Sequence, residues 1–354
     1  MGKEDLATSK EFKMKLNRQM GLHLRYIDLF CGIGGFRIGA GNAADELGMT
    51  SECVFSSDID KDAQDAYEAN FSERPSGDIT RIDASEIPDH EVLFGGFPCQ
   101  AFSIIGEMKG FADARGTLFF DIARILDVKR PRAIVLENVK QLRGHDKGRT
   151  LSTILSILDE LGYWVDFRVL NALDFGLPQK RERILIVGFL DDAHRRFTWP
   201  SGATMPKRSL ESILEKDELV EASYFASPKI RKSRRAAVKG KTLPPGRSVW
   251  HENKSGNISA LPYSCALRAG ASYNYLLVDG IRRLTMREML RLQGFPDSYK
   301  IVCGYSATRK QAGNSVPVPM IQAVVTQVFR ALNRDLSPRE NPSTSRVQPT
   351  LFTL

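Results

Sequence analysis

Short apolar runs alternate with longer segments of helical spacing from Leu24 to about residue 190, and this alternation constrains the fold more than any other feature. The apolar runs cover residues 24–32, 53–60, 90–99, 132–139 and 182–190, and the helical segments cover 36–48, 61–71, 117–131 and 150–163. Strands that alternate with helices of this length form β-α-β units, which place the strands parallel in one sheet. The sequence therefore predicts an α/β domain with a Rossmann-like, doubly wound sheet.

The pattern changes beyond residue 190. Between 191 and 282 the residues Pro, Ser, Gly, Lys and Arg become frequent and periodicity weakens, which indicates a smaller, irregular second domain. Strong helical patterns return at 284–296 and 318–334, and the polar end of the chain has the composition of a disordered tail. We expect five parts: a charged extension at 1–23, the large domain at 24–190, the second domain at 191–282, a return to the large domain at 283–334 and a disordered tail at 335–354.

Basic residues are unevenly distributed in this chain of net charge +8. Eight of them, and no acidic residue, stand between Lys229 and Arg247 in the second domain. Such a run suits the phosphate backbone of a nucleic acid, and the alternative is a solvated loop.

Cysteine and histidine usage argues against two classes of site. The five cysteines are scattered without a C-x-x-C pair and the five histidines form no cluster, which disfavours a disulfide framework and a zinc site. No apolar run approaches the roughly 20 residues of a membrane span, and the charged first 20 residues lack a signal-peptide core. We therefore expect a cytoplasmic protein with no metal site and no membrane contact.

Three glycines, Gly32, Gly34 and Gly35, end the first apolar run, and Asp58 ends the second. Glycines at the carboxyl end of a strand let the backbone approach a ligand at the edge where open α/β sheets bind cofactors. The stretch "GIGGFRIG" matches the dinucleotide fingerprint only in part, so tight turn packing explains the glycines equally well when they are taken alone. With Asp58 available for ribose hydroxyls, the pattern favours a nucleoside-type cofactor.

Cys99 and Glu137 end two further apolar runs, which places both at the same edge of the predicted sheet. Taken alone, Cys99 is a buried thiol, a metal ligand or a nucleophile, and Glu137 is a helix cap or one half of a surface ion pair. Beside a glycine loop, the two together favour a shared substrate.

Several motifs occur in the order found in the DNA cytosine-C5 methyltransferases, which the sequence resembles from about Leu24 to Arg334 outside its middle segment. They are "DLFCGIGGF", "GDIT", "GFPCQAFS", "RGTLFFDIAR", "ENV", "QKRERI", "RLTMREMLRLQGFP" and "GNSVPVP". The resemblance implies an S-adenosylmethionine-dependent methyltransferase fold with a target-recognition domain at 191–282. It also implies methyl transfer to C5 of cytosine in a short DNA sequence, with S-adenosylhomocysteine as the second product.

The resemblance assigns catalytic roles to four residues. Cys99 fits the nucleophile that adds to C6 and activates C5. Glu137 fits the group that contacts N3 and the exocyclic amine and supplies a proton. Arg181 and Arg183 resemble the pair that faces the base, with Arg183 expected at cytosine O2.

The resemblance also assigns cofactor contacts. Phe30 is expected against the adenine, Asp58 at the ribose, Asp78 at the adenine amine and Asn314 at the closing side of the site. The remaining expected contacts are Gly32, Gly34, Gly35, Ile59, Ile79, Pro98 and Leu118. Asp58 and Ile59 replace a longer Glu and an aromatic residue that are common in the family, which bears on cofactor affinity alone.

The target carbon is inaccessible inside a duplex, so the cytosine must be flipped out of double-stranded DNA. Phosphate contacts from the basic second domain would position the duplex, and a few side chains would contact bases. The candidates are Arg231, Lys232, Arg234, Arg235, Arg247, Trp250, His251, Asn253, Lys254, Asn257 and Arg268.

The end of the chain carries one more short motif. "QPTLF", from Gln348 to Phe352, resembles the Gln-x-x-Leu-Phe peptide that docks on the bacterial sliding clamp, with Leu351 and Phe352 as apolar anchors. The alternative is a chance pentamer. We further expect a bacterial, nucleoid-associated monomer from a restriction–modification system, whose cognate endonuclease would be a partner that the sequence does not establish.

Two other hypotheses stay open at the level of sequence. Methylation of cytosine in transfer RNA would keep the chemistry, and a non-catalytic DNA-binding protein would keep the fold. The basic run favours duplex DNA over RNA, and the intact set of Cys99, Glu137, Arg181 and Arg183 favours catalysis. A nicotinamide dehydrogenase would explain neither "PCQ" nor "ENV".

Overall fold

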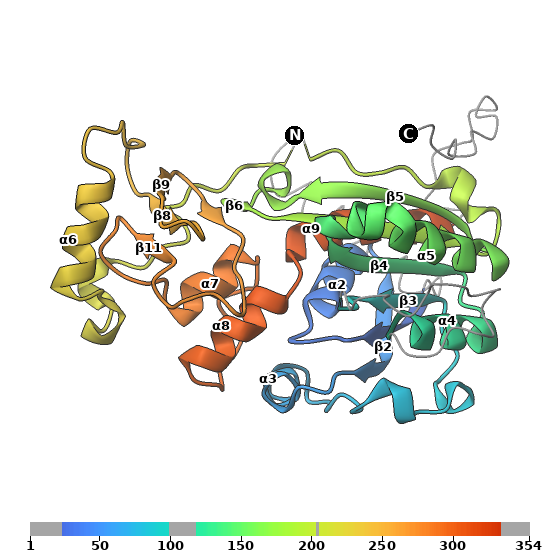
Figure 1. The fold of residues 1–354 in the computed structure, drawn as a ribbon. Helices are drawn as coiled ribbons and strands as arrows, with labels where there is room; N and C mark the ends of the chain where they lie inside the picture. Colours follow the sequence, from blue (N-terminus) through green and yellow to red (C-terminus); the bar gives the residue numbers. More distant parts are fainter. Residues whose placement is uncertain (1–22, 99–117, 203–204, 334–354) are drawn as a thin grey trace, which may run out of the picture.

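The computed structural model describes residues 23–98, 118–202 and 205–333, and its centre is a six-stranded sheet ordered β2-β1-β3-β4-β7-β5 (Figure 1). Parallel pairs join β1 (His23–Leu29), β2 (Thr50–Ser57), β3 (Val92–Gly95) and β4 (Ala133–Val139). β7 (Glu182–Phe189) runs antiparallel to β4 and to β5 (Trp164–Asn171). The predicted α/β sheet is present, but the expectation that it is parallel throughout is wrong at β7. No crossover helix stands between β5 and β7, and without one the chain returns in the opposite direction.

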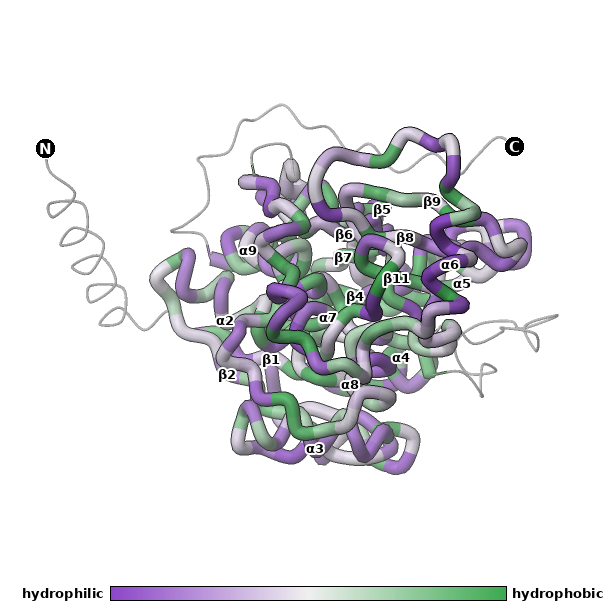
Figure 2. Tube along the Cα trace, turned by 90° about the vertical axis from the view of Figure 1, so that its left-hand side faces the viewer, coloured by the Kyte–Doolittle hydropathy of each residue, from purple (hydrophilic) through white to green (hydrophobic). Residues whose placement is uncertain are grey.

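Helices cover both faces of the sheet. α2 (Gly35–Leu47) and α9 (Val318–Leu332) pack on one face, and α4 (Leu118–Lys129) and α5 (Arg149–Glu160) pack on the other. Successive strand residues point to opposite faces, so Tyr26 lies in the first core and Ile27 in the second. Double coverage explains why the strands appear as continuous apolar runs in the sequence. In Figure 2 the hydrophobic residues follow the central strands, and much of the outer surface is hydrophilic.

A short polar residue sets the start of α3 (Lys61–Phe71) near the sheet edge. α3 begins at Asp60, whose side chain accepts the backbone N–H groups of Asp62 and Ala63. Asp60 thereby holds the chain as it leaves β2, next to Asp58.

The second unit contains a three-stranded antiparallel sheet of β8 (Val249–Glu252), β9 (Ile258–Leu261) and β11 (Leu276–Val278). α6 (Pro228–Ala237) lies at its outer end, at the left of Figure 1. The basic run from Lys229 to Arg247 is thus helical up to Ala237, and its remainder is turn and coil. Ser227 accepts the backbone N–H of Ile230, and Pro228 occupies the first turn, both of which favour a helix start.

A shared core joins the two units. α7 (Met286–Leu292) and α8 (Tyr305–Asn314) pack together with residues of β8 and β11, and α9 alone returns to the large sheet. Arg282 and Glu288, both fully buried, form an ion pair of 2.8 Å at the start of α7. In addition, β10 (Ser264–Cys265) of the second unit pairs in parallel with β6 (Gln179–Lys180), which immediately precedes β7.

The sequence expectations for the two ends of the chain fall largely outside the described residues. β1 begins at His23, so the charged extension is represented by that residue alone, and the tail beyond Asn333 is not described. Within the described ranges, no helix has the length and apolar character needed to cross a membrane.

Candidate active site

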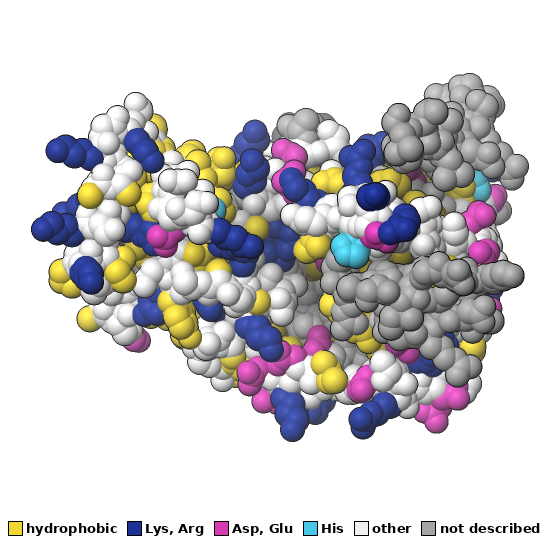
Figure 3. All heavy atoms as spheres, viewed as in Figure 1, with side chains coloured by type: hydrophobic (Ala, Val, Ile, Leu, Met, Phe, Trp, Pro, Cys, Tyr) yellow, Lys and Arg dark blue, Asp and Glu magenta, His cyan; other side chains and the backbone are white. Residues whose placement is uncertain are grey.

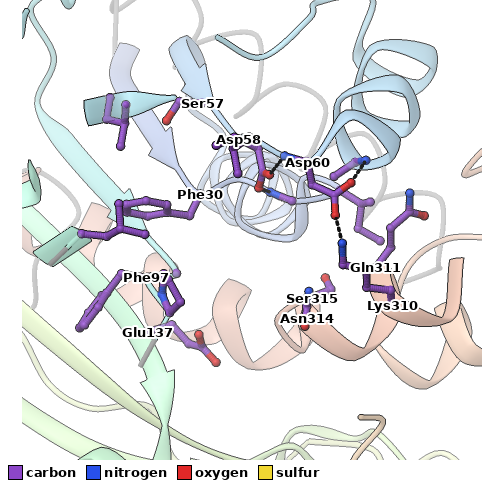
Figure 4. A pocket seen from close by; sticks show the side chains of 18 of the residues that line it. Phe30, Ser57, Asp58, Asp60, Phe97, Glu137, Lys310, Gln311, Asn314 and Ser315 are labelled. Atoms are coloured by element: carbon purple, nitrogen blue, oxygen red, sulfur yellow. Dashed lines mark hydrogen bonds and ion pairs between the residues drawn. The ribbon is translucent and has the colours of Figure 1, made fainter. Parts of the chain in front are cut away.

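A cavity of about 480 Å³ opens at the carboxyl ends of β1, β2 and β4, between the large sheet and the end of α8 (Figure 4). Phe30, Asp58 and Glu137 reach it from the sheet side, and Asn314 and Ser315 reach it from α8. This is the edge at which open α/β sheets bind ligands. The volume lies within the range of small-molecule sites.

Glu137 and Arg183 form a buried ion pair at one end of this cavity. Glu137 Oε1 and Arg183 Nε are 2.7 Å apart, and about a tenth of each side chain is exposed. The pair meets because Glu137 near the end of β4 lies across the antiparallel ladder from the start of β7. Burial raises the pKa of Glu137, and the nearby charges of Arg183 and Arg181 offset part of that rise. The carboxyl group therefore holds a proton to higher pH than a free glutamate does.

Asn138 fixes the chain that leads to the predicted nucleophile. Its buried amide donates a hydrogen bond to the carbonyl of Phe97, at 3.0 Å. Phe97 and Pro98 line the cavity, and Cys99 lies outside the described residues. This role of Asn138 was not predicted from the sequence, although its place beside Glu137 in "ENV" was a signal.

Phe30 and Asp58 give another part of the cavity wall the features of a nucleoside site. Phe30 follows β1 with a φ of +57°, a left-handed conformation that is costly for a bulky residue and is found mostly at functional sites. Asp58 accepts the backbone N–H groups of Gly32 and Asp60, each at 2.8 Å, and keeps further acceptor capacity. Burial raises the pKa of Asp58, and these two hydrogen bonds oppose the rise.

Most of the predicted cofactor residues line this cavity: Phe30, Gly32, Asp58, Ile59, Asp78, Ile79, Pro98, Leu118 and Asn314. Ile59 stands with 73% of its surface exposed. Asp78 accepts hydrogen bonds from the backbone and hydroxyl of Thr80, which lower its pKa.

Gly34 and Gly35, which were expected at the cofactor, are not among the residues that line the cavity. Gly34 has a φ of +81°, and a Cβ there would come within 2.3 Å of the Phe71 ring. A Cβ on Gly35 would come within 2.7 Å of the Val316 side chain. Both glycines allow α2 to start close to its neighbours, which is a packing role.

Several lining residues were not predicted: Ser57, Asp60, Phe97, Asn138, Lys310, Gln311 and Ser315. Lys310 donates to Asp60 across the cavity mouth, at 2.6 Å, and so joins α8 to the start of α3. Lys310 and Gln311 precede Asn314 by four and three residues, a helical spacing that places all three on one face. That spacing in "RKQAGNS" could have identified them.

Arg181, which was expected beside the base, is not among the residues that line the cavity. Only 1% of its surface is exposed, and its guanidinium donates to the carbonyls of Leu267, Gly313 and Ser315. Burial lowers the pKa of Arg181 to about 9, so the group still carries its charge at neutral pH.

Three of the residues predicted to contact DNA make contacts within the protein. Trp250 is 5% exposed, packs with Val238 and Ile258, and donates its indole N–H to Ser248. Arg234 is buried on the inner face of α6, where it pairs with Glu252. Arg247 pairs with Asp217 and Asp279, at 2.8 and 2.6 Å. Each of these side chains has partners within the protein, which leaves less of it available to DNA.

The other predicted DNA contacts remain accessible in varying degree. Lys232, Arg235, Lys254, Asn257 and Arg268 are exposed, and Arg231 and His251 are half-buried. Asn253 is exposed, but its side chain accepts the backbone N–H groups of Ser255 and Asn257 and so shapes the turn between β8 and β9. Lys and Arg side chains stand out along the second unit in Figure 3.

The cavity has the donors and acceptors of an organic ligand site. In the described part of the chain, no group of His, Cys, Asp and Glu has the arrangement of a metal site. A buried carboxyl group paired with a guanidinium at one end, and a carboxylate beside a glycine loop at the other, suit proton transfer next to a bound nucleoside.

Comparisons with known proteins agree with this geometry. Residues 24–330 match the family model described as C-5 cytosine-specific DNA methylase. The chain is 59% identical to Type II methyltransferase M.NgoBI of Neisseria gonorrhoeae over 297 residues, which span 84% of this chain and 90% of that protein. It is 54% identical to Type II methyltransferase M.HaeII of Haemophilus aegyptius over 307 residues, with coverages of 87% and 93%.

Solved structures share the fold. A mutant of DNMT2 from Spodoptera frugiperda has a TM-score of 0.65 at 21% identity, covering 86% of this chain and 99% of its own. A putative DNA modification methyltransferase encoded in an E. coli prophage has a TM-score of 0.62 at 18% identity, with coverages of 87% and 99%. The overall fold is thus common to all three.

Proposed function

The chain belongs to the C-5 cytosine-specific DNA methylases, and from this premise we propose how its residues carry out the reaction. The enzyme is a DNA cytosine-5-methyltransferase that acts on cytosine within a specific DNA sequence. The observation that carries the proposal is the buried Glu137–Arg183 pair at the end of the cavity. It supplies a proton donor and a fixed cation at the point where the sheet edge meets the segment leading to Cys99.

Cys99 is the proposed nucleophile. C5 of cytosine is weakly nucleophilic, and addition of a thiolate to C6 forms a C6–S bond while moving the ring electrons toward C5 and N3. S-adenosylmethionine would supply the methyl group that C5 gains at this stage. Loss of the C5 proton and elimination of the thiolate from C6 would then restore the aromatic ring and free Cys99. Asn138 supports this role, because its bond to the Phe97 carbonyl holds the chain two residues before Cys99.

Glu137 is the proposed acid at N3. Its raised pKa keeps a proton available as negative charge develops on the ring, and a carboxyl oxygen can accept the exocyclic amine. Arg183 holds the carboxyl group in place and presents further N–H donors for cytosine O2. The two residues thus act together on one edge of the base.

The cavity suits S-adenosylmethionine, which supplies the electrophilic methyl group. The buried hydroxyl of Ser57 lines the cavity and has no hydrogen-bond partner in the described residues, so a polar ligand there would satisfy it. Asp58 would accept the ribose hydroxyls and Asp78 the adenine amine, with Phe30 against the ring. Asn314 and Ser315 would close the cavity from α8.

Double-stranded DNA is the proposed substrate, held with the target base flipped out. The exposed basic residues of α6 and the polar turn at 253–257 are proposed to contact it. Type II methyltransferases among the relatives support a place in a restriction–modification system. Binding of the sliding clamp by Gln348, Leu351 and Phe352, and the existence of a cognate endonuclease, stay predictions.

Bisulfite sequencing of DNA from a methylation-free bacterial host tests the proposal. Expression of the protein should protect cytosines in one short sequence context, and Cys99→Ser should abolish the protection. Both proteins should bind S-adenosylhomocysteine in calorimetry, which separates loss of chemistry from loss of folding. Protection that persists in Cys99→Ser would refute the assigned nucleophile, and absence of protected DNA with modified transfer RNA would favour the RNA alternative.

A further inference from the structure

The loop at residues 266–272, between β10 and β11, is fixed to the sheet edge by two side chains from the "QKR" segment. The backbone N–H of Leu267 donates to Gln179 Oε1 at 3.2 Å, and Arg181 Nη1 donates to the Leu267 carbonyl at 3.1 Å. Gln179 is fully buried and Arg181 is 1% exposed. Because buried polar groups must be paired, the two side chains fix the position of Leu267 relative to the large sheet.

The same arginine reaches the wall of the cavity. Arg181 Nη2 donates to the carbonyls of Gly313 and Ser315, the two residues on either side of Asn314. A Cβ on Gly313 would come within 2.6 Å of the backbone nitrogen of Ala269, so only glycine lets the loop pack directly on α8. The 266–272 loop is therefore in direct contact with the helix end that lines the cavity.

One exposed arginine stands on this loop. The guanidinium of Arg268 lies over the Tyr275 ring, with its central carbon 4.8 Å from the ring centre, and the backbone N–H of Arg268 donates to the Tyr275 hydroxyl at 2.8 Å. In the described part of the chain Arg268 forms no ion pair with a carboxylate. Further along the loop, Arg309 of α8 donates to the Ala271 carbonyl at 2.6 Å. The loop is held on both sides of Arg268, and the arginine itself is free for an anion or a base edge.

We propose that Gln179 and Arg181 are positioning residues that hold the 266–272 loop in register with the active site, so that Arg268 contacts DNA bases next to the flipped cytosine. The inference rests on the proposed function. It differs from the expectation that Arg181 faces the base, because a side chain with 1% exposure and three carbonyl partners has no surface to offer a base. Arginine pairs bidentately with guanine, which makes Arg268 suited to sequence discrimination.

The test measures discrimination with purified full-length enzyme. We define the discrimination ratio as kcat/KM for the duplex protected in the bisulfite experiment, divided by kcat/KM for a duplex with one neighbouring base changed. This ratio is measured for the wild type and for Arg268→Ala, Gln179→Leu and Arg181→Lys. We expect each substitution to lower this ratio about tenfold at one base position, since a specific arginine contact is worth about that factor. Arg268 is exposed, so its variant is expected to fold, and an unchanged ratio there would overturn the proposal.

A double-mutant cycle separates positioning from base contact. Gln179→Leu and Arg181→Lys both release Leu267, so the double variant should lose no more discrimination than either single variant. Adding Gln179→Leu to Arg268→Ala should also have little further effect. The proposal would be contradicted if the losses of discrimination in the double variants were the product of those in the single variants. A fall in kcat that is equal on all duplexes would likewise indicate that Arg181 acts at the base.

Asn70 provides a matched control. It holds the backbone of Lys300 in the same two-sided way, accepting its N–H at 2.7 Å and donating to its carbonyl at 3.0 Å, far from the 266–272 loop in sequence. Asn70→Leu should lower the melting temperature and leave the discrimination ratio unchanged. A lowered ratio in this variant would mean that general loosening explains the effect and would overturn the proposal. Failure of the wild type to methylate any duplex would instead refute the proposed function.

Discussion

The cavity edge of the large sheet and helix α6 both carry arginine, but they use its charge in opposite ways. At the cavity, Arg183 is buried and paired with Glu137 at 2.7 Å. On α6, Lys232 and Arg235 point into solvent, while Arg234 between them is buried against Glu252. A buried charge acts at one fixed point and is costly to disturb, whereas exposed charges act together through a screened field. We therefore expect the buried arginine at the cavity to act in the reaction and the exposed basic residues of α6 to contribute general affinity for DNA.

The largest effect is expected at the cavity. Glu137→Gln keeps the shape of the side chain but removes the acid, so kcat should fall by roughly 10²–10⁴-fold while DNA affinity changes little. Because burial raises the pKa of Glu137 and the protonated form is the active one, wild-type kcat should fall as pH rises through that pKa. Single-turnover rates across pH measure both effects. A normal rate in Glu137→Gln would mean that the buried pair at the cavity does not act as the acid, and the contrast with α6 would be lost.

The next effect sharpens the contrast within α6 itself. Arg234→Ala leaves Glu252 without its partner and should lower the free energy of unfolding by roughly 1–3 kcal/mol, less than for a fully buried pair because Glu252 is about a third exposed. Lys232→Ala on the same helix should leave the stability nearly unchanged. Thermal melting of both variants gives the comparison. Equal melting temperatures for Arg234→Ala and Lys232→Ala would mean that the buried Arg234–Glu252 pair does not contribute to the free energy of unfolding.

Asp28 tests whether burial without a partner is costly near the cavity edge. It is fully buried on β1, and neither carboxyl oxygen has a hydrogen-bond partner in the described residues. Burial raises its pKa well above the usual range, with Asp58 and Glu73 adding to the rise and Arg37 opposing it. The folded state therefore binds this proton more tightly than the unfolded state.

The contribution of Asp28 to stability should fall as pH rises from about 4 toward its folded pKa, by up to about 1.4 kcal/mol per pH unit. Asp28→Asn should remove this dependence and should raise the melting temperature at neutral pH relative to the wild type. Melting curves between pH 4 and 8 measure it. Parallel curves for the two proteins would indicate that a bound partner satisfies the carboxyl group.

The smallest effect belongs to the exposed charges. Lys232→Ala and Arg235→Ala should each weaken DNA binding a few-fold, equally for specific and non-specific duplexes. Each should also reduce the slope of log affinity against log salt by about 1, since one phosphate contact is lost. Titrations at several salt concentrations with Lys129→Ala as the control variant measure the change, because Lys129 lies on α4 and is held by Asp89. If the salt slope of both variants stays at the wild-type value, the DNA does not contact these residues of α6.

Local residue patterns alone identified much of the large domain. Buried strands and amphipathic helices leave strong periodic signals. The elements from β1 to β4, the helices between them, α5 and β7 therefore lie close to the predicted segments. β5 was not predicted, because it lacks a clear apolar run. The positions of Asp58 and Glu137 at one edge follow from strand ends in the same way, whereas Asn314, at the end of α8, was expected only from the family resemblance. Local signals also include the capping residues Asp60 and Ser227, but the basic composition around Ser227 obscured the helix α6.

Tertiary contacts decided the direction of β7 and the division of roles among the basic residues. Arg181 and Arg183 stand two residues apart in one segment, yet one bonds three backbone carbonyls and the other pairs with Glu137. Likewise, Arg234 and Trp250 belong to the predicted DNA-binding set but are buried against the partners that folding brings to them. Sequence patterns determine which residues can form an element and which chemistry they can perform. Burial and partners depend on segments distant along the chain, so only the folded structure assigns each charge to its task.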